Sequence, residues 1–338
     1  MQELMLTAPG NLSWKQAKEP QLTTTGALVR PIAVSTCDFD HLMCAGHVNF
    51  PLPLAIGHEC VAEVISVGGD VNTIQVGDRV VVSFQVSCGV CHQCKAGRSA
   101  SCEAVPWLSS YGLGAVSGNW GGAMSDILAV AYADAMLFPI PKDMNAASAT
   151  CLSCNMSDAY RCVAPQLARH PEAPVIIVAG AFDNIALYSA GIATTLGASQ
   201  VDIYGINPAA YEKAEAMGAN ILMSSKEVKA NQYPIAVDAS MNIEKLGLAI
   251  NACAPAGEIT LSTMYPDKST PIPLMQMFEK CLSLTTGQPD LSTSIGPALQ
   301  LLSDHTQKFD AIMDDVKPWN EAPIVFSAGM GKHVLMRD

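Results

Sequence analysis

Short runs of apolar residues, broken by turn residues, dominate roughly the first 140 positions of the chain. Apolar runs at residues 27–34, 60–67 and 77–82 are separated by turn signals such as Gly68-Gly69-Asp70. Runs of this length with glycine-rich turns between them are typical of an all-β domain. The pattern therefore predicts a β-rich domain over residues 1–150.

The pattern changes near Pro174, where apolar strands begin to alternate with helix-length amphipathic segments. A helix is expected to end at Leu196-Gly197-Ala198, because glycine is common just after a helix C-terminus. The strands of this part are expected at residues 175–181, 201–205, 234–238 and 258–263. Strand–helix–strand alternation predicts a parallel sheet, so residues 151–287 are interpreted as an α/β domain.

Composition and charge exclude several classes of protein. With 31 acidic and 19 basic side chains, the 338-residue chain has a net charge of −12, which argues against a nucleic-acid partner held by overall positive charge. Hydrophobic residues make up 49% of the chain and charged residues 15%, which excludes disorder. No apolar run approaches the roughly 20 residues of a membrane-spanning helix, and residues 1–10 lack the apolar core of a secretory signal. We therefore expect a cytoplasmic protein with no membrane partner.

Four of the 12 cysteines form a cluster with metal-ligand spacing. They are Cys88, Cys91, Cys94 and Cys102, in a C-x2-C-x2-C-x7-C pattern. In a reducing compartment clustered thiols are more often metal ligands than disulfides, and this spacing lets four sulfurs close a tetrahedral zinc shell. Because a closed shell leaves no position for a substrate, the sequence predicts a structural zinc on this loop.

A second set of possible ligands, Cys37, His58 and Cys154, is scattered along the chain. Two thiolates and one imidazole would leave the fourth zinc position open, as in catalytic zinc sites. Spacing alone does not join these residues, since a lone cysteine or histidine is usually part of the packed core.

A family resemblance does join them. Cys37, the Gly57-His58-Glu59 triplet, residues 76–80 (VGDRV), the four-cysteine loop and residues 121–123 (GGA) resemble the zinc-dependent medium-chain alcohol dehydrogenases. The C-terminal part is most similar to the short formaldehyde-dehydrogenase-like and threonine-dehydrogenase-like branches. The resemblance implies a catalytic zinc held by Cys37, His58 and Cys154, with Glu59 able to exchange onto the metal. It also implies that Asp40 orders a hydrogen bond beside the site.

The resemblance further implies an α/β fold with two domains. Residues 1–150, completed by residues 288–338, would form a GroES-like catalytic domain, and residues 151–287 would form a Rossmann-type domain with a doubly wound parallel sheet. The expected reaction is hydride transfer between NADP or NAD and a small alcohol, aldehyde or ketone, assisted by zinc as a Lewis acid. A homodimer or homotetramer is usual for this family.

The cofactor-binding turn departs from the family pattern. A Rossmann turn normally needs three glycines, whereas here the turn consists of Gly180, Ala181, Phe182, Asp183 and Asn184. The turn is interpreted as remodelled, with its backbone N–H groups still facing the phosphates. At the end of the next strand, Gly205 stands where an NAD-specific relative has an acidic residue, with Asn207 two positions later. A glycine at this position leaves room for a 2′-phosphate, which favours NADP. No arginine follows to bind that phosphate, however, so NADP is favoured only slightly over NAD.

The expected proton path is also altered. Phe39 and Leu42 occupy the positions where relatives carry a hydroxyl and often a histidine, and phenylalanine cannot relay a proton. His41 is one residue out of register and, on an extended segment, would point to the other face. Two alternatives follow: a zinc-retaining reductase of an unsaturated or imine bond, and a pseudo-dehydrogenase that has lost the dinucleotide and acts as a binding protein.

Overall fold

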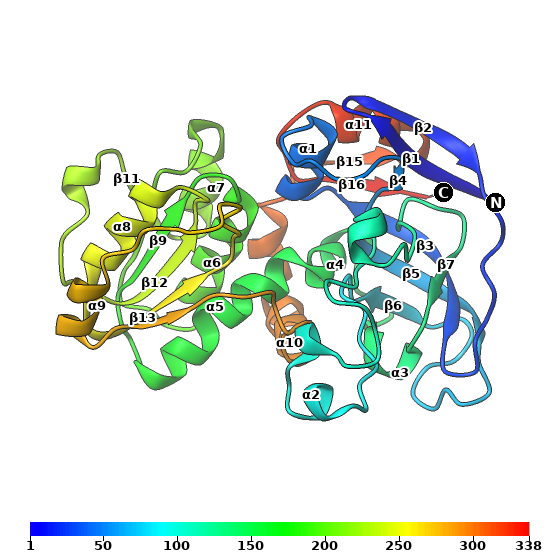
Figure 1. The fold of residues 1–338 in the computed structure, drawn as a ribbon, viewed down its shortest axis with the longest axis horizontal. Coiled ribbons are helices and arrows are strands. Elements are labelled where there is room, and N and C mark those ends of the chain that lie inside the picture. The colour runs from blue at the N-terminus through cyan, green and yellow to red at the C-terminus, as the bar shows by residue number, and fades with distance from the viewer. Residues whose placement is uncertain (338) are drawn as a thin grey trace. The chain divides into compact units, whose positions relative to one another are not determined.

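The computed structural model describes residues 1–337, and the chain divides into two compact units (Figure 1). Unit 1 comprises residues 1–157, 290–306 and the residues from 313 onward, and unit 2 comprises residues 158–289 and 307–312. Helix α10 (Leu291–Asp310) contributes to both units and has a non-helical residue, His305, close to the division. Each unit is described by itself below.

Unit 1 is built on two β-sheets. The larger has the strand order β15-β16-β3-β5-β6-β8, with β7 pairing β3, and the smaller has the order β2-β1-β4. The bounds of these strands are β1 Gln2–Ala8, β2 Asn11–Gln16, β3 Ala27–Ser35, β4 Leu54–Ala55, β5 Glu59–Val67, β6 Arg79–Val82, β7 Leu128–Val130, β8 Leu137–Pro139, β15 Asp315–Pro318 and β16 His333–Met336. Strands β3, β5 and β6 coincide closely with the three apolar runs predicted near the N-terminus.

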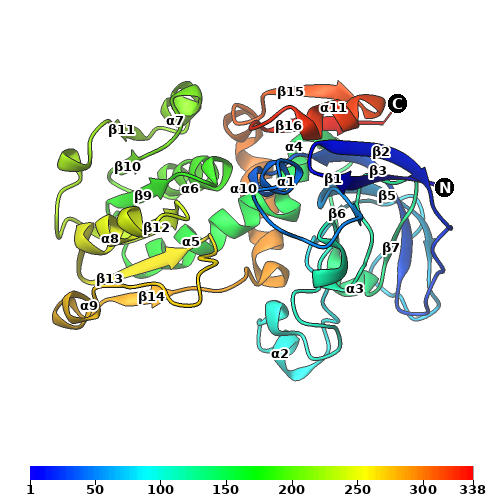
Figure 2. The same cartoon turned by 45° about the horizontal axis from the view of Figure 1, so that its top comes forward.

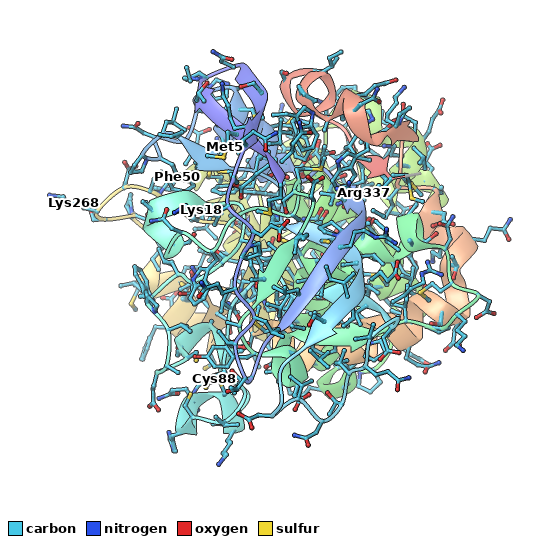
Figure 3. The ribbon with its side chains drawn as sticks, turned by 90° about the vertical axis from the view of Figure 1, so that its right-hand side faces the viewer. Met5, Lys18, Phe50, Cys88, Lys268 and Arg337 are labelled. Carbon is cyan, nitrogen blue, oxygen red and sulfur yellow. The ribbon has the colours of Figure 1, made fainter. Side chains whose placement is uncertain are left out.

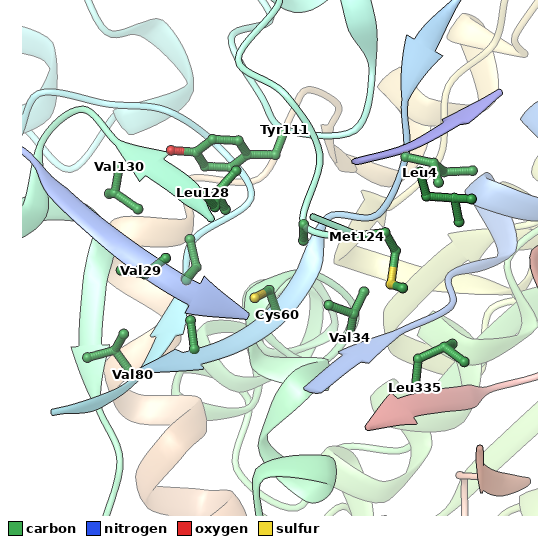
Figure 4. Packing of buried hydrophobic residues seen from close by; sticks show 14 of the residues in the cluster. Leu4, Val29, Val34, Cys60, Val80, Tyr111, Met124, Leu128, Val130 and Leu335 are labelled. Carbon is green, nitrogen blue, oxygen red and sulfur yellow. The ribbon is translucent and has the colours of Figure 1, made fainter. Parts of the chain in front are cut away.

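Alternating side chains of the larger sheet form the core of unit 1 (Figure 4). Val29 and Val34 of β3 and Val80 of β6 are completely buried, and the ring of Tyr111 packs among them with its hydroxyl donating to the Ala129 carbonyl oxygen. Burial in β3 alternates from Ala27 to Ala33, as expected for a strand with one face on a core, and the irregular register between Pro31 and Ala33 brings Val34 to the core face.

The C-terminal residues return to this sheet. Strand β16 pairs antiparallel with β3 and parallel with β15, so the last part of the chain completes the unit begun by the first part (Figure 2). Arg337, just after β16, holds the C-terminal segment against the sheet (Figure 3). Its guanidinium lies 4.1 Å from the centre of the Trp319 ring and donates to the Ser125 and Pro31 carbonyl oxygens.

Unit 2 contains a six-stranded sheet in the order β11-β10-β9-β12-β13-β14, in which every pairing is parallel. Its strands are β9 Val175–Ala179, β10 Val201–Tyr204, β11 Asn220–Leu222, β12 Tyr233–Ala239, β13 Cys253–Leu261 and β14 Ser283–Thr285. Ile176 and Val178 pack on one face with residues of α8, and strand alternation turns Ile177 toward α6 on the other. The α/β class with a β-rich unit and a Rossmann-type sheet is thereby confirmed.

The α-helices range in length from four residues, as in α2, to the 20 residues of α10. The α-helices are α1 Asp38–Cys44, α2 His92–Lys95, α3 Ala133–Met136, α4 Ala146–Ala149, α5 Asn155–Arg169, α6 Asp183–Thr195, α7 Tyr211–Ala216, α8 Ile243–Ala252, α9 Leu274–Lys280 and α11 Ala322–Ser327, besides α10. The 3-10 helices are η1 Ser99–Ser101, η2 Gly114–Ser117, η3 Thr150–Ser153, η4 Pro208–Ala210, η5 Ser225–Glu227 and η6 Trp319–Glu321. Within residues 1–337, none of the helices combines the length and the apolar character needed to cross a bilayer.

The extended conformation expected after Cys37 is wrong, because that segment is helix α1. The side chain of Asp40 accepts a hydrogen bond from the Cys37 backbone N–H at 3.1 Å and so stabilises the first turn. On a helix, His41 lies about 100° around the axis from Leu42 rather than on the opposite face from it. Its Nε2 pairs with the Gly331 carbonyl oxygen at 3.2 Å.

Candidate functional site

Strand pairing in unit 1 brings Cys37, His58 and Cys154 together. Ser35 at the end of β3 pairs with Glu59 at the start of β5, so Cys37 and His58 emerge side by side. Cys154 follows η3, which is fixed to β5 by two hydrogen bonds between the Ser153 hydroxyl and the Cys60 backbone. The two sulfurs and one ring nitrogen lie within 4.8 Å of one another, and all three side chains are buried.

Asp40 orients His58 and Cys37 through contacts of its two carboxylate oxygens. One carboxylate oxygen of this buried side chain lies 3.1 Å from Nδ1 of His58, and the other accepts the Cys37 backbone N–H. Histidines that bind metals are usually held in this way, because a partner for one ring nitrogen fixes the tautomer and leaves the other nitrogen to bind the metal.

The electrostatics of Cys37 favour the thiolate form that binds metal, whereas those of His58 favour a protonated ring whose proton a metal would have to displace. The pKa of Cys37 lies well below its usual value, because Cys154 donates a hydrogen bond to it and His58 adds a favourable charge, which together outweigh burial. Burial acts to lower the pKa of His58, but the charges of Asp40 and Cys37 and the hydrogen bonds with them together outweigh burial, so this pKa lies above its usual value. Two cysteines and one histidine, brought this close and buried, fit Zn²⁺ with one coordination position left open.

Glu59 lies beside this group but is not one of the three clustered ligands. Its carboxylate is completely buried and accepts hydrogen bonds from the Ser35 hydroxyl at 2.7 Å and the Asn155 backbone N–H at 2.8 Å. The ammonium group of Lys332 forms an ion pair with it. Because both oxygens are bound by protein donors, exchange of Glu59 onto a metal stays a prediction.

Lys332 and Asn155 are two functional candidates that the sequence reasoning missed. Lys332 is only 1% exposed, and its Nζ also donates to Oδ1 of Asn155 at 2.8 Å. Nδ2 of Asn155 in turn donates to the Cys37 sulfur at 3.2 Å. A single chain of contacts therefore links the cation, the buried carboxylate and a candidate ligand sulfur. The position of Asn155 next to Cys154 was a signal for its role, whereas nothing in the C-terminal pattern indicated that Lys332 would be buried.

Burial and charge act in opposite directions on Lys332. Burial alone lowers the pKa of its ammonium group, but the negative charges of Glu59 and Cys37 outweigh burial, so the pKa stays above its ordinary value. Lys332 is therefore a cation at neutral pH, placed to compensate the negative charge that Glu59 and Cys37 bring into the core.

The four-cysteine loop forms a second cluster in unit 1, and it includes α2 (Figure 1) and Cys88, which is labelled in Figure 3. The sulfurs of Cys88, Cys91, Cys94 and Cys102 lie within 4.8 Å of one another. Backbone N–H groups of Cys91 and Cys94 point at the sulfurs of Cys88 and Cys91, at 3.4 and 3.5 Å. Hydrogen bonds from the Glu103 and Cys94 backbones lower the pKa of Cys91 to about 6. All 12 cysteines are free thiols in the described chain, so this loop is not held by a disulfide.

Substitution of Cys91 by serine is expected to remove one zinc ion and to lower the melting temperature of the protein by about 5–10 °C, because the loop loses the metal that would join its four sulfurs. Zinc content and thermal unfolding measure both effects. Cys281→Ser, which changes an exposed thiol outside both clusters, is the control and should leave both values unchanged. Full zinc content in Cys91→Ser would contradict the structural zinc.

The candidate cofactor residues meet in unit 2 at the carboxyl ends of β9 and β10. Gly180 to Asn184 connect β9 with α6, and Gly205 and Asn207 lie in the loop after β10. A Cβ on Gly180 would lie 2.8 Å from the Ser240 carbonyl oxygen, so this position has no room for a side chain. The strand order reverses between β9 and β12, and such a switch point is where nucleotides bind in open parallel sheets.

The turn itself is closed onto the neighbouring strand. The N–H groups of Ala181 and Phe182 donate to the carbonyl oxygens of Ser240 and Ala239, at 3.3 and 3.1 Å. Phe182 is buried, and Asp183 is the first residue of α6. The strand order is therefore that of a nucleotide-binding sheet, while the turn presents fewer N–H donors to a phosphate than a glycine-rich turn does.

The side chains at the expected relay positions are apolar. The ring of Phe39, in α1, packs edge-on against Phe50 with 5.9 Å between the ring centres. No hydroxyl group therefore stands at this position of α1 to pass a proton along.

Comparison with known proteins adds independent information on this chain. Residues 23–142 match the family model described as the alcohol dehydrogenase GroES-like domain. The chain is 27% identical to a probable zinc-binding alcohol dehydrogenase of Mycobacterium tuberculosis, over 95% of this chain and 83% of that protein. It is 30% identical to the glutathione-independent formaldehyde dehydrogenase of Pseudomonas aeruginosa, over 66% of this chain and 57% of the relative. The solved alcohol dehydrogenase of Thermus sp. ATN1 superposes with a TM-score of 0.89 at 25% identity, and both chains are covered completely, at 100%.

Proposed function

The chain belongs to the zinc-dependent medium-chain alcohol dehydrogenases, and on that premise we propose that it is an oxidoreductase that transfers a hydride between a nicotinamide cofactor, NADP or NAD, and an alcohol, aldehyde or ketone. The observation that supports this proposal most is the buried group of Cys37, His58 and Cys154, which offers three zinc ligands and leaves a fourth position open. Zinc held there would act as a Lewis acid on the oxygen of the substrate.

Each protein group around this centre has a distinct task in the proposal. Asp40 holds the His58 ring and fixes its tautomer through Nδ1. Asn155 donates a hydrogen bond to the Cys37 sulfur, which stabilises the thiolate form that binds metal. Lys332 neutralises Glu59, so that the buried site does not accumulate negative charge beside the two thiolates. The proposal includes a cytoplasmic, reducing location and self-association as a dimer or tetramer.

Steady-state assays with purified, zinc-loaded protein test the proposal. Aliphatic and aromatic alcohols, with NAD or NADP, and the matching aldehydes and ketones, with the reduced cofactors, should include a pair that turns over in a zinc-dependent manner. Saturable quenching or enhancement of NADH or NADPH fluorescence checks cofactor binding separately. If neither cofactor binds and no member of the panel is turned over, the proposed function is wrong and a binding protein is favoured.

A second candidate function is reduction of a C=C or C=N bond conjugated to a polar group. It is favoured by Phe39, because an apolar ring replaces the expected relay hydroxyl and such a substrate does not require that path for an alcohol proton. Enals and cyclic imines should therefore be assayed beside the carbonyl compounds. Turnover of an enal at its double bond, without turnover of alcohols, would favour this second function.

A further inference from the structure

We propose that Asp183 takes over recognition of the adenosine ribose hydroxyls and thereby selects NAD(H) over NADP(H). This inference rests on the proposed function, since it concerns the cofactor of that reaction. It makes Asp183 a specificity-determining residue, although it lies in the phosphate-binding turn rather than at the end of β10.

The carboxylate of Asp183 points toward the loop in which a ribose-binding acid is normally found. Its Oδ2 accepts the backbone N–H of Asn207 at 3.1 Å, and Asn207 lies shortly after the end of β10. In dinucleotide-binding folds the acid that binds the ribose hydroxyls stands at the end of this strand. Asp183 therefore delivers a carboxylate to the same loop from the neighbouring turn.

The other oxygen of this carboxylate has no hydrogen-bond donor among the described residues. Asp183 is 8% exposed, and this oxygen, Oδ1, is buried. A buried carboxylate oxygen without a donor is unfavourable, and a hydroxyl group from a ligand would satisfy it. The side chain also lies in the first turn of α6, where the positive end of the helix dipole stabilises its negative charge.

Residue 205, where the ribose-binding acid of this fold normally stands, is a glycine with crowded surroundings in this protein. Gly205 has φ +81°, and a Cβ placed on it would lie 2.6 Å from Nζ of Lys245 and 3.0 Å from the Ala179 carbonyl oxygen. The Lys245 ammonium group is held there because it donates to the carbonyl oxygens of Ala179 and Gly205, at 2.8 and 3.1 Å. The positive φ at residue 205 and the close Ala179 carbonyl oxygen therefore strain any acidic side chain there, which leaves the role to a carboxylate from another position.

The same arrangement disfavours a 2′-phosphate. A 2′-phosphate would face the negative charge of Asp183. It would also replace the 2′-hydroxyl that can donate to Oδ1, so that only the 3′-hydroxyl remains as a donor. Lys245 is the cation nearest this loop in the described contacts, but two carbonyl oxygens already accept hydrogen bonds from it and its charge acts on both Asp183 and Asp238. The local balance of charge therefore favours NAD(H).

Fluorescence titration of the zinc-loaded protein with NADH and NADPH tests the inference. The wild type should bind NADH more tightly than NADPH. In Asp183→Asn the dissociation constant for NADH should rise by about tenfold or more, because a hydrogen bond to a charged group is lost, whereas NADPH binding should not weaken. Glu212→Gln, which removes an exposed carboxylate from the start of α7, is the matched control and should keep the wild-type preference.

Thermal unfolding separates a ligand-binding role from a structural one. Burial raises the pKa of Asp183 to about 6. Because this exceeds the pKa in the unfolded chain, the ionised carboxylate destabilises the cofactor-free fold above that pH. Asp183→Asn should therefore raise the melting temperature at pH 8 while weakening NADH binding, which loss of a structural contact would not do.

Three results would overturn the inference. An unchanged preference in Asp183→Asn would show that the carboxylate does not contact the ribose. Tighter binding of both cofactors by Asp183→Gly would show that the carboxylate obstructs the pyrophosphate instead. If the wild type bound neither cofactor, the proposed function would fail and this inference with it, so failure of the inference alone is recognised by NADH binding that does not respond to residue 183.

Discussion

Replacing Cys37 with alanine is expected to remove one of two bound zinc ions and to lower kcat/KM for the preferred alcohol or aldehyde by about 10³-fold or more. Cys37, His58 and Cys154 would share that ion, and loss of one thiolate leaves too few ligands to hold it. A Lewis acid contributes several kcal/mol of stabilisation to the developing charge in such a reaction, and about 1.4 kcal/mol corresponds to a factor of ten in rate. Zinc analysis and steady-state kinetics on the same sample measure both effects.

The matched control for this experiment is Cys44→Ala. Cys44 lies on α1, is as deeply buried as Cys37, and belongs to neither metal-ligand group. It should keep both zinc ions and most of its activity, with only a modest loss of stability from the missing sulfur. If Cys37→Ala retained both ions and full turnover, the catalytic zinc site would be incorrectly placed.

Lys332→Met is expected to lower the free energy of unfolding of the protein by about 3–5 kcal/mol, because it removes one partner of a buried ion pair and leaves the other charged. Glu59 would keep only the Ser35 hydroxyl and the Asn155 backbone N–H as donors. Asn155 would also lose the hydrogen bond from Lys332 to its Oδ1. The side-chain amide that donates to the Cys37 sulfur would then be held less firmly. Urea unfolding of zinc-loaded protein measures the change in stability.

Two further variants decide whether charge pairing explains that loss. Lys332→Arg keeps the cation and should lose less stability than Lys332→Met. The double variant Lys332→Met with Glu59→Gln removes both charges and should recover a large part of the stability that the single variant loses. If the double variant were as unstable as the two single changes added together, the ion pair would not be the stabilising interaction.

The parts of the fold that could be predicted from the sequence are those in which one short stretch contains all the information. The apolar runs that became β3, β5 and β9 are local, and the four-cysteine loop is recognised from spacing alone. Cys37, His58 and Cys154 could be joined only through the family resemblance, because they are far apart in the sequence. The structure brings their donor atoms together, while their role as ligands stays a prediction.

Other features could not be predicted because they depend on contacts between distant segments. Nothing around Lys332 distinguishes it from a surface lysine, yet it reaches Glu59 across 273 positions of chain. The sequence assigned Asp183 to the cofactor-binding turn, but it could not show that the carboxylate of Asp183 accepts the Asn207 backbone N–H. Helix α1 was missed because its N-cap residue is Cys37, which was interpreted only as a metal ligand. The Cys37 N–H donates to the side chain of Asp40 and so caps the helix.

The position of Lys332 beside β16 has a consequence for the order in which the site matures during synthesis. A ribosome adds about 5–20 residues per second, so Lys332 is made roughly ten to thirty seconds after Cys154. During that interval a nascent chain can contain Cys37, His58 and Cys154 while Glu59 still lacks its cation, and β3 lacks its neighbour β16. The nascent protein therefore has every proposed zinc ligand well before it has the charge balance that stabilises them, and a chain released early would carry an unfinished metal centre.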